Sequence, residues 1–226
     1  QQCYIELALN LWNDSLEIKE RIGDIKGKAA TLANLAYWAG ETGDHKKQLT
    51  LNLQSAEALG QIRAYSNLLT VLSNLGAAAE ENDQQYLAQA VWLTLRIQAP
   101  LPTAINRLHA LYQRIPKGDP LEVLLGATAS FFCKTRGADH PQLQQFQEIS
   151  VKILLGAATE QSVDQEVDNA FQTWMTEQQL TEPSVFLPQL NTQLETLIGD
   201  SWVFDPAPLR AQEDQLISAY QWHAST

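Results

Sequence analysis

Two asparagines are the residues whose type and spacing most readily suit a function in this chain. Asn34 lies in the stretch 31–44 (TLANLAYWAGETGD) and Asn74 in the stretch 71–83 (VLSNLGAAAEEND), so matching segments stand 74 − 34 = 40 positions apart. A carboxamide carries both a hydrogen-bond donor and an acceptor, so it can pair with a peptide unit whatever side chain that unit bears. The alternative is that both asparagines bond to neighbouring helix backbone. Peptide binding is therefore one of two hypotheses for this pair.

Residues suited to catalysis or metal binding are scattered along the chain. None of the histidines has a cysteine, aspartate or second histidine at the spacing of a metal site; they are His45, His109, His140 and His223. Asp139-His140 falls between two expected helices, where helix capping is the simpler role. Cys133 follows Phe131-Phe132 on an apolar helix face, so we expect a buried structural thiol. The sequence predicts no enzymatic activity, no cofactor and no metal.

Tryptophans are a second group that could hold a ligand. The six are Trp12, Trp38, Trp92, Trp174, Trp202 and Trp222. They are widely separated, and most occupy helical positions, so packing in the core or between helices is expected rather than a ligand cage. Trp202 differs, because Ser201–Phe204 is predicted to be a loop between helices.

Helices are the elements that must position these residues. Apolar residues recur at helical spacing throughout, and no stretch alternates long enough to form a sheet, which predicts an all-α fold. Helices are expected at Tyr4–Gly23, Ile25–Gly43, His45–Leu59, Gln61–Glu81, Gln84–Ala99, Thr103–Ile115, Pro120–Thr135, Asp139–Ala158, Ser162–Gln179, Pro183–Ile198 and Pro206–Trp222. Taken in pairs, they keep a spacing of roughly 40 residues, which is typical of stacked repeats.

The matched segments resemble the tetratricopeptide (TPR) repeat in its roughly 40-residue form, as in kinesin light chains. Small residues follow each Asn-Leu pair, and polar turns, Thr42–Asp44 and Asn82-Asp83, close the segments. The resemblance implies a right-handed superhelix, or solenoid, of about five antiparallel helix pairs. Residues 1–100 would hold a half repeat and two full repeats. Residues 101–226 would form degenerate, acidic TPR-like hairpins, with a separate helical bundle as the alternative. Tyr4–Gly23 resembles the second helix of a repeat, so either the sequence is a fragment of a longer chain or this helix caps the array. We expect the fragment, with an uncovered apolar side on this helix.

The resemblance also implies a binding site. In TPR proteins the first helices line the concave face, and in relatives of kinesin light chains an asparagine at this point holds the backbone of an extended peptide. The peptide-binding residues implied here are Asn34, Tyr37 and Glu41 on the first such helix and Ser73, Asn74, Ala77 and Glu81 on the next. The lysine pair with which chaperone-binding TPRs clamp a terminal carboxylate is absent, so we do not expect that ligand class.

Charge and composition restrict the partner. The net charge is −11, and it arises from residues 139–226, where 13 acids face only Lys152 and Arg210 (13 − 2 = 11). This disfavours nucleic acid and anionic membranes, and it predicts either a solvated face or a docking surface for a basic partner. No apolar run approaches membrane-spanning length. Cys3 and Cys133 are the only cysteines, so a reducing cytoplasmic location is expected.

The function expected from these features is a non-catalytic protein–protein interaction scaffold within a larger bacterial-type protein. Its partner would be a peptide or a protein. One alternative is a small-molecule-sensing superhelix of a signalling ATPase or transcription regulator, which a closed apolar pocket would favour. The other is an architectural role through self-association.

Overall fold

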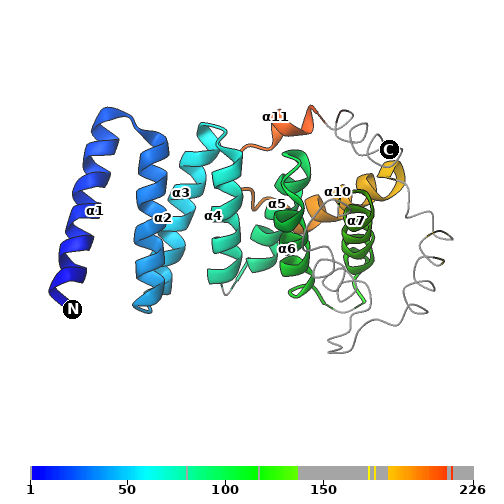
Figure 1. Cartoon of the computed structure of the whole chain (residues 1–226), viewed down its shortest axis with the longest axis horizontal. Helices are drawn as coiled ribbons and strands as arrows, with labels where there is room; N and C mark the ends of the chain where they lie inside the picture. The colour runs from blue at the N-terminus through cyan, green and yellow to red at the C-terminus, as the bar shows by residue number, and fades with distance from the viewer. Residues whose placement is uncertain are drawn as a thin grey trace. The chain divides into compact units, whose positions relative to one another are not determined.

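The computed structural model describes residues 2–79, 81–116, 118–136, 173, 176, 183–212 and 215. Every secondary-structure element assigned in these ranges is an α-helix (Figure 1), so the predicted all-α class is confirmed. The helices are α1 (Gln2–Ile22), α2 (Ile25–Glu41), α3 (His45–Gln61), α4 (Tyr65–Ala78), α5 (Asp83–Arg96), α6 (Leu101–Tyr112), α7 (Pro120–Arg136), α10 (Pro183–Ile198) and α11 (Ala207–Arg210). The helices predicted at 139–158 and 162–179, together with Trp174, Trp222, His140, His223 and the side chain of Cys133, lie outside the described residues.

A residue in the left-handed conformation follows each of the helices α1 to α6. Between α1 and α7 the residues with positive φ are Gly23 (72°), Gly43 (78°), Arg63 (55°), Asn82 (62°), Gln98 (48°) and Gly118 (82°). They recur at nearly even intervals, and each lies in the connection between two consecutive helices. A left-handed residue ends a helix because it turns the chain out of the helical path, and glycine does so without a Cβ penalty.

Aspartates begin two successive helices in the same way. The side chain of Asp24 accepts a hydrogen bond from Gly27 N–H at 2.9 Å, and that of Asp44 from Lys47 N–H at 3.1 Å. Asp119 does the same for the start of α7, at 2.8 Å from Leu121 N–H. Each bond satisfies an amide that the first turn of a helix leaves without a partner.

Several predicted helix boundaries were wrong by one to four residues, and two places show why. We expected α3 to end at Leu59 and α4 to begin at Gln61, but α3 continues to Gln61 and α4 begins at Tyr65. The reason is Arg63, which takes the left-handed conformation while its N–H bonds to Gly60 O at 3.1 Å. The helix expected to begin at Thr103 begins at Leu101, so Pro102 lies in the first turn of α6, where no N–H is required of it.

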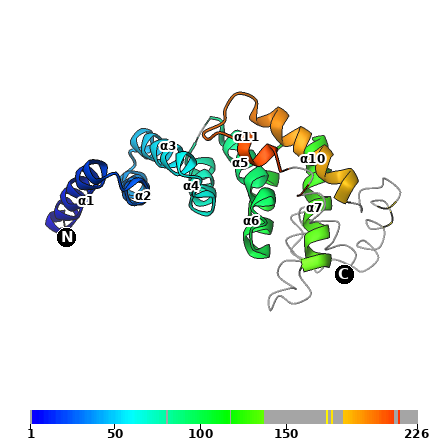
Figure 2. The same cartoon turned by 90° about the horizontal axis from the view of Figure 1, so that it is seen from above.

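The chain forms two compact units, of which the first comprises Gln1–Tyr86 and Asp200–Pro206. Within it, α1, α2, α3 and α4 follow one another as neighbouring helices (Figures 1 and 2). Small residues allow α2 and α3 to pack closely: Ala29, Ala36 and Ala56 are completely buried. The hydroxyl of Ser55 on α3 donates to Ala29 O on α2 at 2.9 Å, which fixes the register of this helix pair.

The segment 200–206 packs against the end of α3, although it is distant in sequence. Phe204 is buried, and the ring of Trp202 meets it edge-on at 5.5 Å between centroids. Gly60 makes room for this contact, because a Cβ placed on it would lie 2.8 Å from Phe204 Cβ. Trp202 therefore packs in a loop between helices.

The second unit comprises Leu87–Gly199 and Ala207–Thr226, and a fully buried tryptophan connects two of its helices. Trp92 Nε1 on α5 donates to Glu195 Oε1 on α10 at 3.0 Å, and Arg96 lies 3.5 Å above the Trp92 ring. Arg210 on α11 holds both oxygens of Glu195, at 3.0 and 3.1 Å. The prediction that the tryptophans serve packing is confirmed for Trp92.

Two further contacts hold α7 in this unit. The rings of Phe131 on α7 and Phe186 on α10 are 5.5 Å apart. Between α6 and α7, burial and a hydrogen bond to Glu122 raise the pKa of the Tyr112 phenol to about 12. None of the described helices is both long and apolar enough to cross a lipid bilayer.

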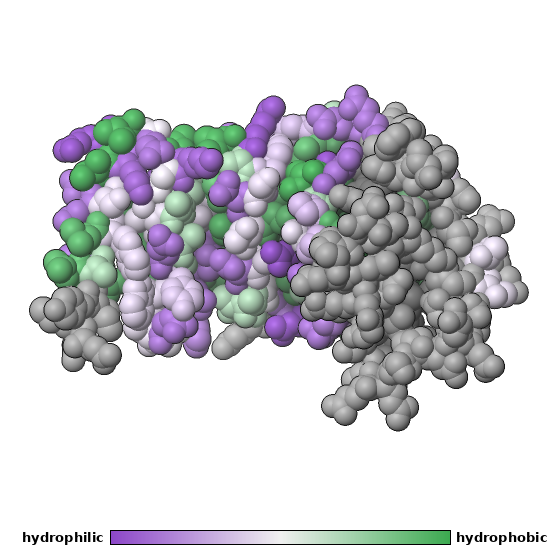
Figure 3. All heavy atoms as spheres, viewed as in Figure 1, coloured by the Kyte–Doolittle hydropathy of each residue, from purple (hydrophilic) through white to green (hydrophobic). Residues whose placement is uncertain are grey.

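The helix α1 carries an uncovered apolar stripe. Its members are Leu7, Leu11, Ile18 and Ile22, which are 55%, 59%, 48% and 66% exposed. The spacings of four, seven and four residues place them on one side of the helix, and apolar surface is visible over α1 at the left of Figure 3. The expectation that this helix has an exposed apolar side is confirmed.

Candidate binding pocket

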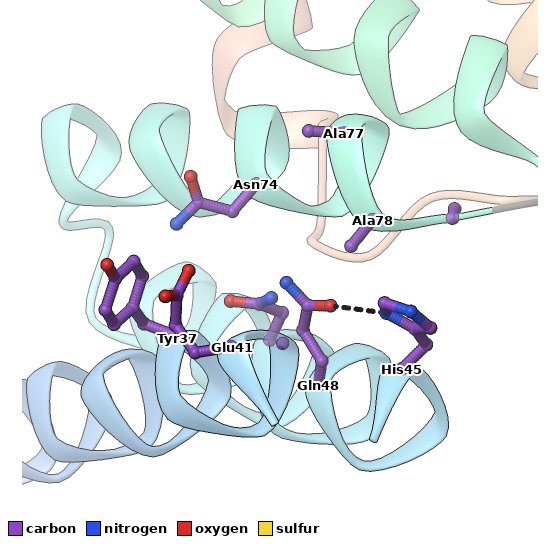
Figure 4. Close-up of a pocket in the computed structure, with 10 residues that line it drawn as sticks. Tyr37, Glu41, His45, Gln48, Asn74, Ala77 and Ala78 are labelled. Atoms are coloured by element: carbon purple, nitrogen blue, oxygen red, sulfur yellow. Dashed lines mark hydrogen bonds between the residues drawn. The ribbon is translucent and has the colours of Figure 1, made fainter. Parts of the chain in front are cut away.

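A pocket of about 490 Å³ lies between α2, α3 and α4, entirely within the first unit (Figure 4). Its lining residues are Tyr37, Gly40 and Glu41 from α2, His45, Gln48 and Asn52 from α3, and Asn74, Ala77, Ala78 and Ala79 from the end of α4. Helices α2 and α4 form its walls, and α3 supplies the polar residues between them. The pocket therefore depends on the packing of three consecutive helices.

The α2 wall presents an aromatic ring and a carboxylate. Tyr37 is 65% exposed, and Glu41, four residues later, is exposed one turn further along. Residues four apart lie on the same side of a helix, and Figure 4 shows both side chains extending toward α4. They offer a ligand a π face and a negative charge side by side.

The α3 residues form a polar stripe that includes a buried carboxamide. His45 Nδ1 and Gln48 Oε1 lie 3.4 Å apart. Asn52, one turn further on, is only 2% exposed, and its Oδ1 accepts no hydrogen bond from any described residue. An unsatisfied buried polar atom typically costs about 1–3 kcal/mol. Asn52 thus provides hydrogen-bonding capacity that the described residues leave unused.

The α4 side of the pocket consists of small alanine side chains and one polar side chain. Asn74 is exposed and points toward Tyr37 and Glu41, while Ala77 and Ala78 leave space beside it. In the described part of the chain, neither the Asn74 nor the Asn34 carboxamide has a hydrogen-bond partner. The alternative hypothesis, that these asparagines bond to neighbouring helix backbone, therefore finds no bond among those residues.

The ends of α2 and α4 differ in how their last carbonyls are satisfied. At the end of α2, Thr42, Gly43 and Asp44 N–H donate to the carbonyls of Trp38, Gly40 and Ala39, at 2.8–3.1 Å.

At the end of α4, Ala79 N–H donates to Leu75 O at 2.9 Å and the chain then becomes extended. No described residue donates to the carbonyls of Ala77 and Ala78. The carbonyl oxygens at the end of α4 are thus hydrogen-bond acceptors in the pocket to which no described residue donates.

The structure brings together four of the seven residues implied by the TPR resemblance: Tyr37, Glu41, Asn74 and Ala77. Asn34 is exposed on α2 but does not line this pocket. Ser73 is half-buried, and its hydroxyl donates to Leu69 O within α4. Glu81 is exposed beyond the end of α4, outside the lining.

Sequence reasoning missed the contribution of α3. His45, Gln48 and Asn52 stand at spacings of three and four, so they form a polar stripe on one side of that helix. This polar stripe, beside the apolar residues Leu49 and Leu53, could have indicated a binding surface on α3. The TPR resemblance instead placed all binding residues on the first helix of each repeat.

No protein-family model matches the chain, and no curated protein or solved structure is significantly similar to it. The pocket must therefore be interpreted from its own residues. Those residues offer donors and acceptors of hydrogen bonds, one aromatic face and one carboxylate. Among the described residues, no three histidines, cysteines or carboxylates gather as a metal site would require.

Proposed function

We propose that the chain is a TPR-type protein–protein interaction module that binds an extended segment of a partner protein along α2 and α4. The proposal rests on the carboxamide side chains of Asn52 and Asn74. Both line one pocket, and both keep hydrogen-bonding atoms that no described residue satisfies. Such groups complement the N–H and C=O of a peptide unit, whatever its side chain. Recognition of backbone at this point suits a scaffold that accepts a segment of extended chain.

The TPR assignment is supported by spacing. The segments around Asn34 and Asn74 match each other, and the left-handed residues Gly23, Gly43, Arg63 and Asn82 recur at about half the offset between those segments. In this proposal α2–α3 and α4–α5 are two repeats of a right-handed superhelix, and α1 is the second helix of the repeat before them. Residues 101–226 would continue it as degenerate helix pairs, in a cytoplasmic scaffold.

The proposal is tested with a peptide selected by phage display on the full chain. Isothermal titration calorimetry then compares wild-type protein with Asn74→Ala. Each lost hydrogen bond typically costs about 0.5–1.5 kcal/mol, which corresponds to a Kd about 2- to 12-fold weaker. The free energy of unfolding should change by less than about 0.5 kcal/mol, because Asn74 is exposed.

Asn106→Ala is the matched control, since Asn106 is an exposed helical asparagine on α6, outside the pocket. Equal Kd values for Asn74→Ala and Asn106→Ala would refute binding at this pocket. Asn34→Ala should weaken only those peptides that extend along α2 beyond the pocket.

A further inference from the structure

The pocket between α2, α3 and α4 offers both donors and acceptors of hydrogen bonds, and several of its acceptors have no partner among the described residues. The groups that no described residue satisfies include acceptors from all three helices: Asn52 Oδ1, the carbonyls of Ala77 and Ala78, and the Glu41 carboxylate. A ligand that satisfies them must bring several donors to one place. The protonated side chains of lysine and arginine do so, with three and five N–H donors respectively.

Charge favours the same ligand. Glu41 is the only acid among the lining residues, and none of them is lysine or arginine. The C-terminal ends of α2 and α4 both line the pocket, whereas the N-terminal end of α3 alone opposes them. Because the C-terminal end of a helix carries partial negative charge, two such ends and one carboxylate attract a cation.

The aromatic residue completes the site. Tyr37 stands one turn before Glu41 and is 65% exposed, so its ring is open to a ligand. A cation placed over a tyrosine ring is stabilised by the negative face of the π system. The pocket volume of about 490 Å³ leaves room for a long side chain together with the peptide unit that carries it.

We infer that this pocket seats a lysine or arginine side chain of the bound peptide, with its charged group held by the Tyr37 ring, the Glu41 carboxylate and the carbonyls at the end of α4. This inference rests on the proposed function and specifies the ligand class. It assigns recognition of the basic residue to the first unit of the chain, whereas the sequence had suggested the acidic residues 139–226.

The test uses two capped tripeptides, Ac-Gly-Lys-Gly-NH2 and Ac-Gly-Nle-Gly-NH2, in which norleucine keeps the apolar stem and removes the ammonium. Titration followed by ¹H–¹⁵N NMR of the full chain gives both Kd values and the site. The lysine peptide should shift the amide signals of Gly40, Ala77 and Ala78, and it should bind about fivefold to tenfold more tightly than the norleucine peptide.

Glu41→Gln should reduce the preference for lysine at least about twofold, because it removes the one lining carboxylate. Glu57→Gln is the matched control, since Glu57 is an exposed glutamate on α3 that does not line the pocket. It should leave the preference unchanged.

Two results would overturn the inference: equal affinities for the two tripeptides, or no shift at the pocket with the lysine peptide. Neither result decides the proposed function, which the display-selected peptide tests separately. If selected peptides bind at Asn74 but carry no basic residue, the peptide-binding function stands and the cation specificity falls. If Asn74→Ala has no effect on them, the proposed function falls instead.

Discussion

Helices α1 and α3 occupy corresponding places in the sequence pattern, yet one is covered and the other is not. Both are followed by a left-handed residue, Gly23 and Arg63 respectively. On α3, Ala58 is 8% exposed, whereas Ile18, its counterpart on α1, is 48% exposed. The difference follows from neighbours, because α3 packs against both α2 and α4 and α1 packs against α2. A helical apolar pattern therefore predicts which side of a helix can be buried, and the adjoining helices decide whether it is.

The largest expected effect contrasts a leucine on each helix. Leu59 on α3 is 3% exposed, and Leu11 on α1 is 59% exposed. Leu59→Ala should lower the free energy of unfolding by about 2–5 kcal/mol, because it removes packed apolar volume and leaves a cavity. Leu11→Ala should change it by less than about 0.5 kcal/mol. Urea unfolding followed by circular dichroism measures both, and similar losses would mean that α1 is covered in solution.

The next effect concerns the segment 200–206, which packs on α3. Gly60→Ala places a methyl group against Phe204 Cβ, which should cost about 1–3 kcal/mol of overpacking, offset by a gain in helix propensity of up to about 1 kcal/mol. Gly40→Ala is the control, because its methyl group meets only the end of the flexible Gln48 side chain. A shift in thermal midpoint for Gly60→Ala alone would verify the contact, and matching midpoints would contradict it.

The two equivalent turns should respond with opposite signs. Gly23→Ala puts a Cβ on a residue with φ of 72°, which should destabilise the protein by about 1–2 kcal/mol. Arg63→Gly relieves the same strain at φ of 55° and should stabilise it by up to about 1 kcal/mol. Chemical unfolding of both variants checks the signs. Destabilisation by Arg63→Gly would show that its side chain contributes more than its backbone strain costs.

The smallest expected effects concern two polar contacts with α2: a hydrogen bond from α3 and an ion pair from α1. Ser55→Ala removes the buried bond from α3 to Ala29 O, at an expected cost of about 0.5–1.5 kcal/mol. Glu20→Gln breaks the exposed ion pair with Lys28, 2.6 Å long, and should cost less than about 0.5 kcal/mol. Only the second loss should vanish at high salt. A larger loss for Glu20→Gln than for Ser55→Ala would contradict the comparison.

Local signals in the sequence predicted much of the fold. The helix Pro183–Ile198 was predicted with its observed bounds, and the helix expected to begin at Pro120 begins there as α7, after Asp119. Proline and aspartate act through their own backbone geometry and capping bonds, so they can be recognised without tertiary structure. The start of α4 was missed because Arg63 takes a conformation for which a glycine is the usual signal.

The residues of the pocket were predicted only in part, because the prediction used positions in the sequence and not neighbours in space. The TPR resemblance implied Tyr37, Glu41, Asn74 and Ala77, and all four line the pocket. It treated Asn34 and Asn74 as equivalents, but only Asn74 lines the pocket with α2 opposite it. What faces a side chain depends on its neighbours in space, which an offset in sequence does not specify.

The contact between Gly60 and Phe204 also has a consequence for the order in which the chain acquires its structure. The two residues are 204 − 60 = 144 positions apart, whereas a helix that packs only on its neighbours can form as soon as they are made. At ribosomal rates of about 5–20 residues per second, the end of α3 waits roughly 7–30 s for residue 204 to be synthesised. Nascent chains arrested before residue 200 should therefore be cleaved by protease near Gly60 more readily than chains arrested well after residue 206.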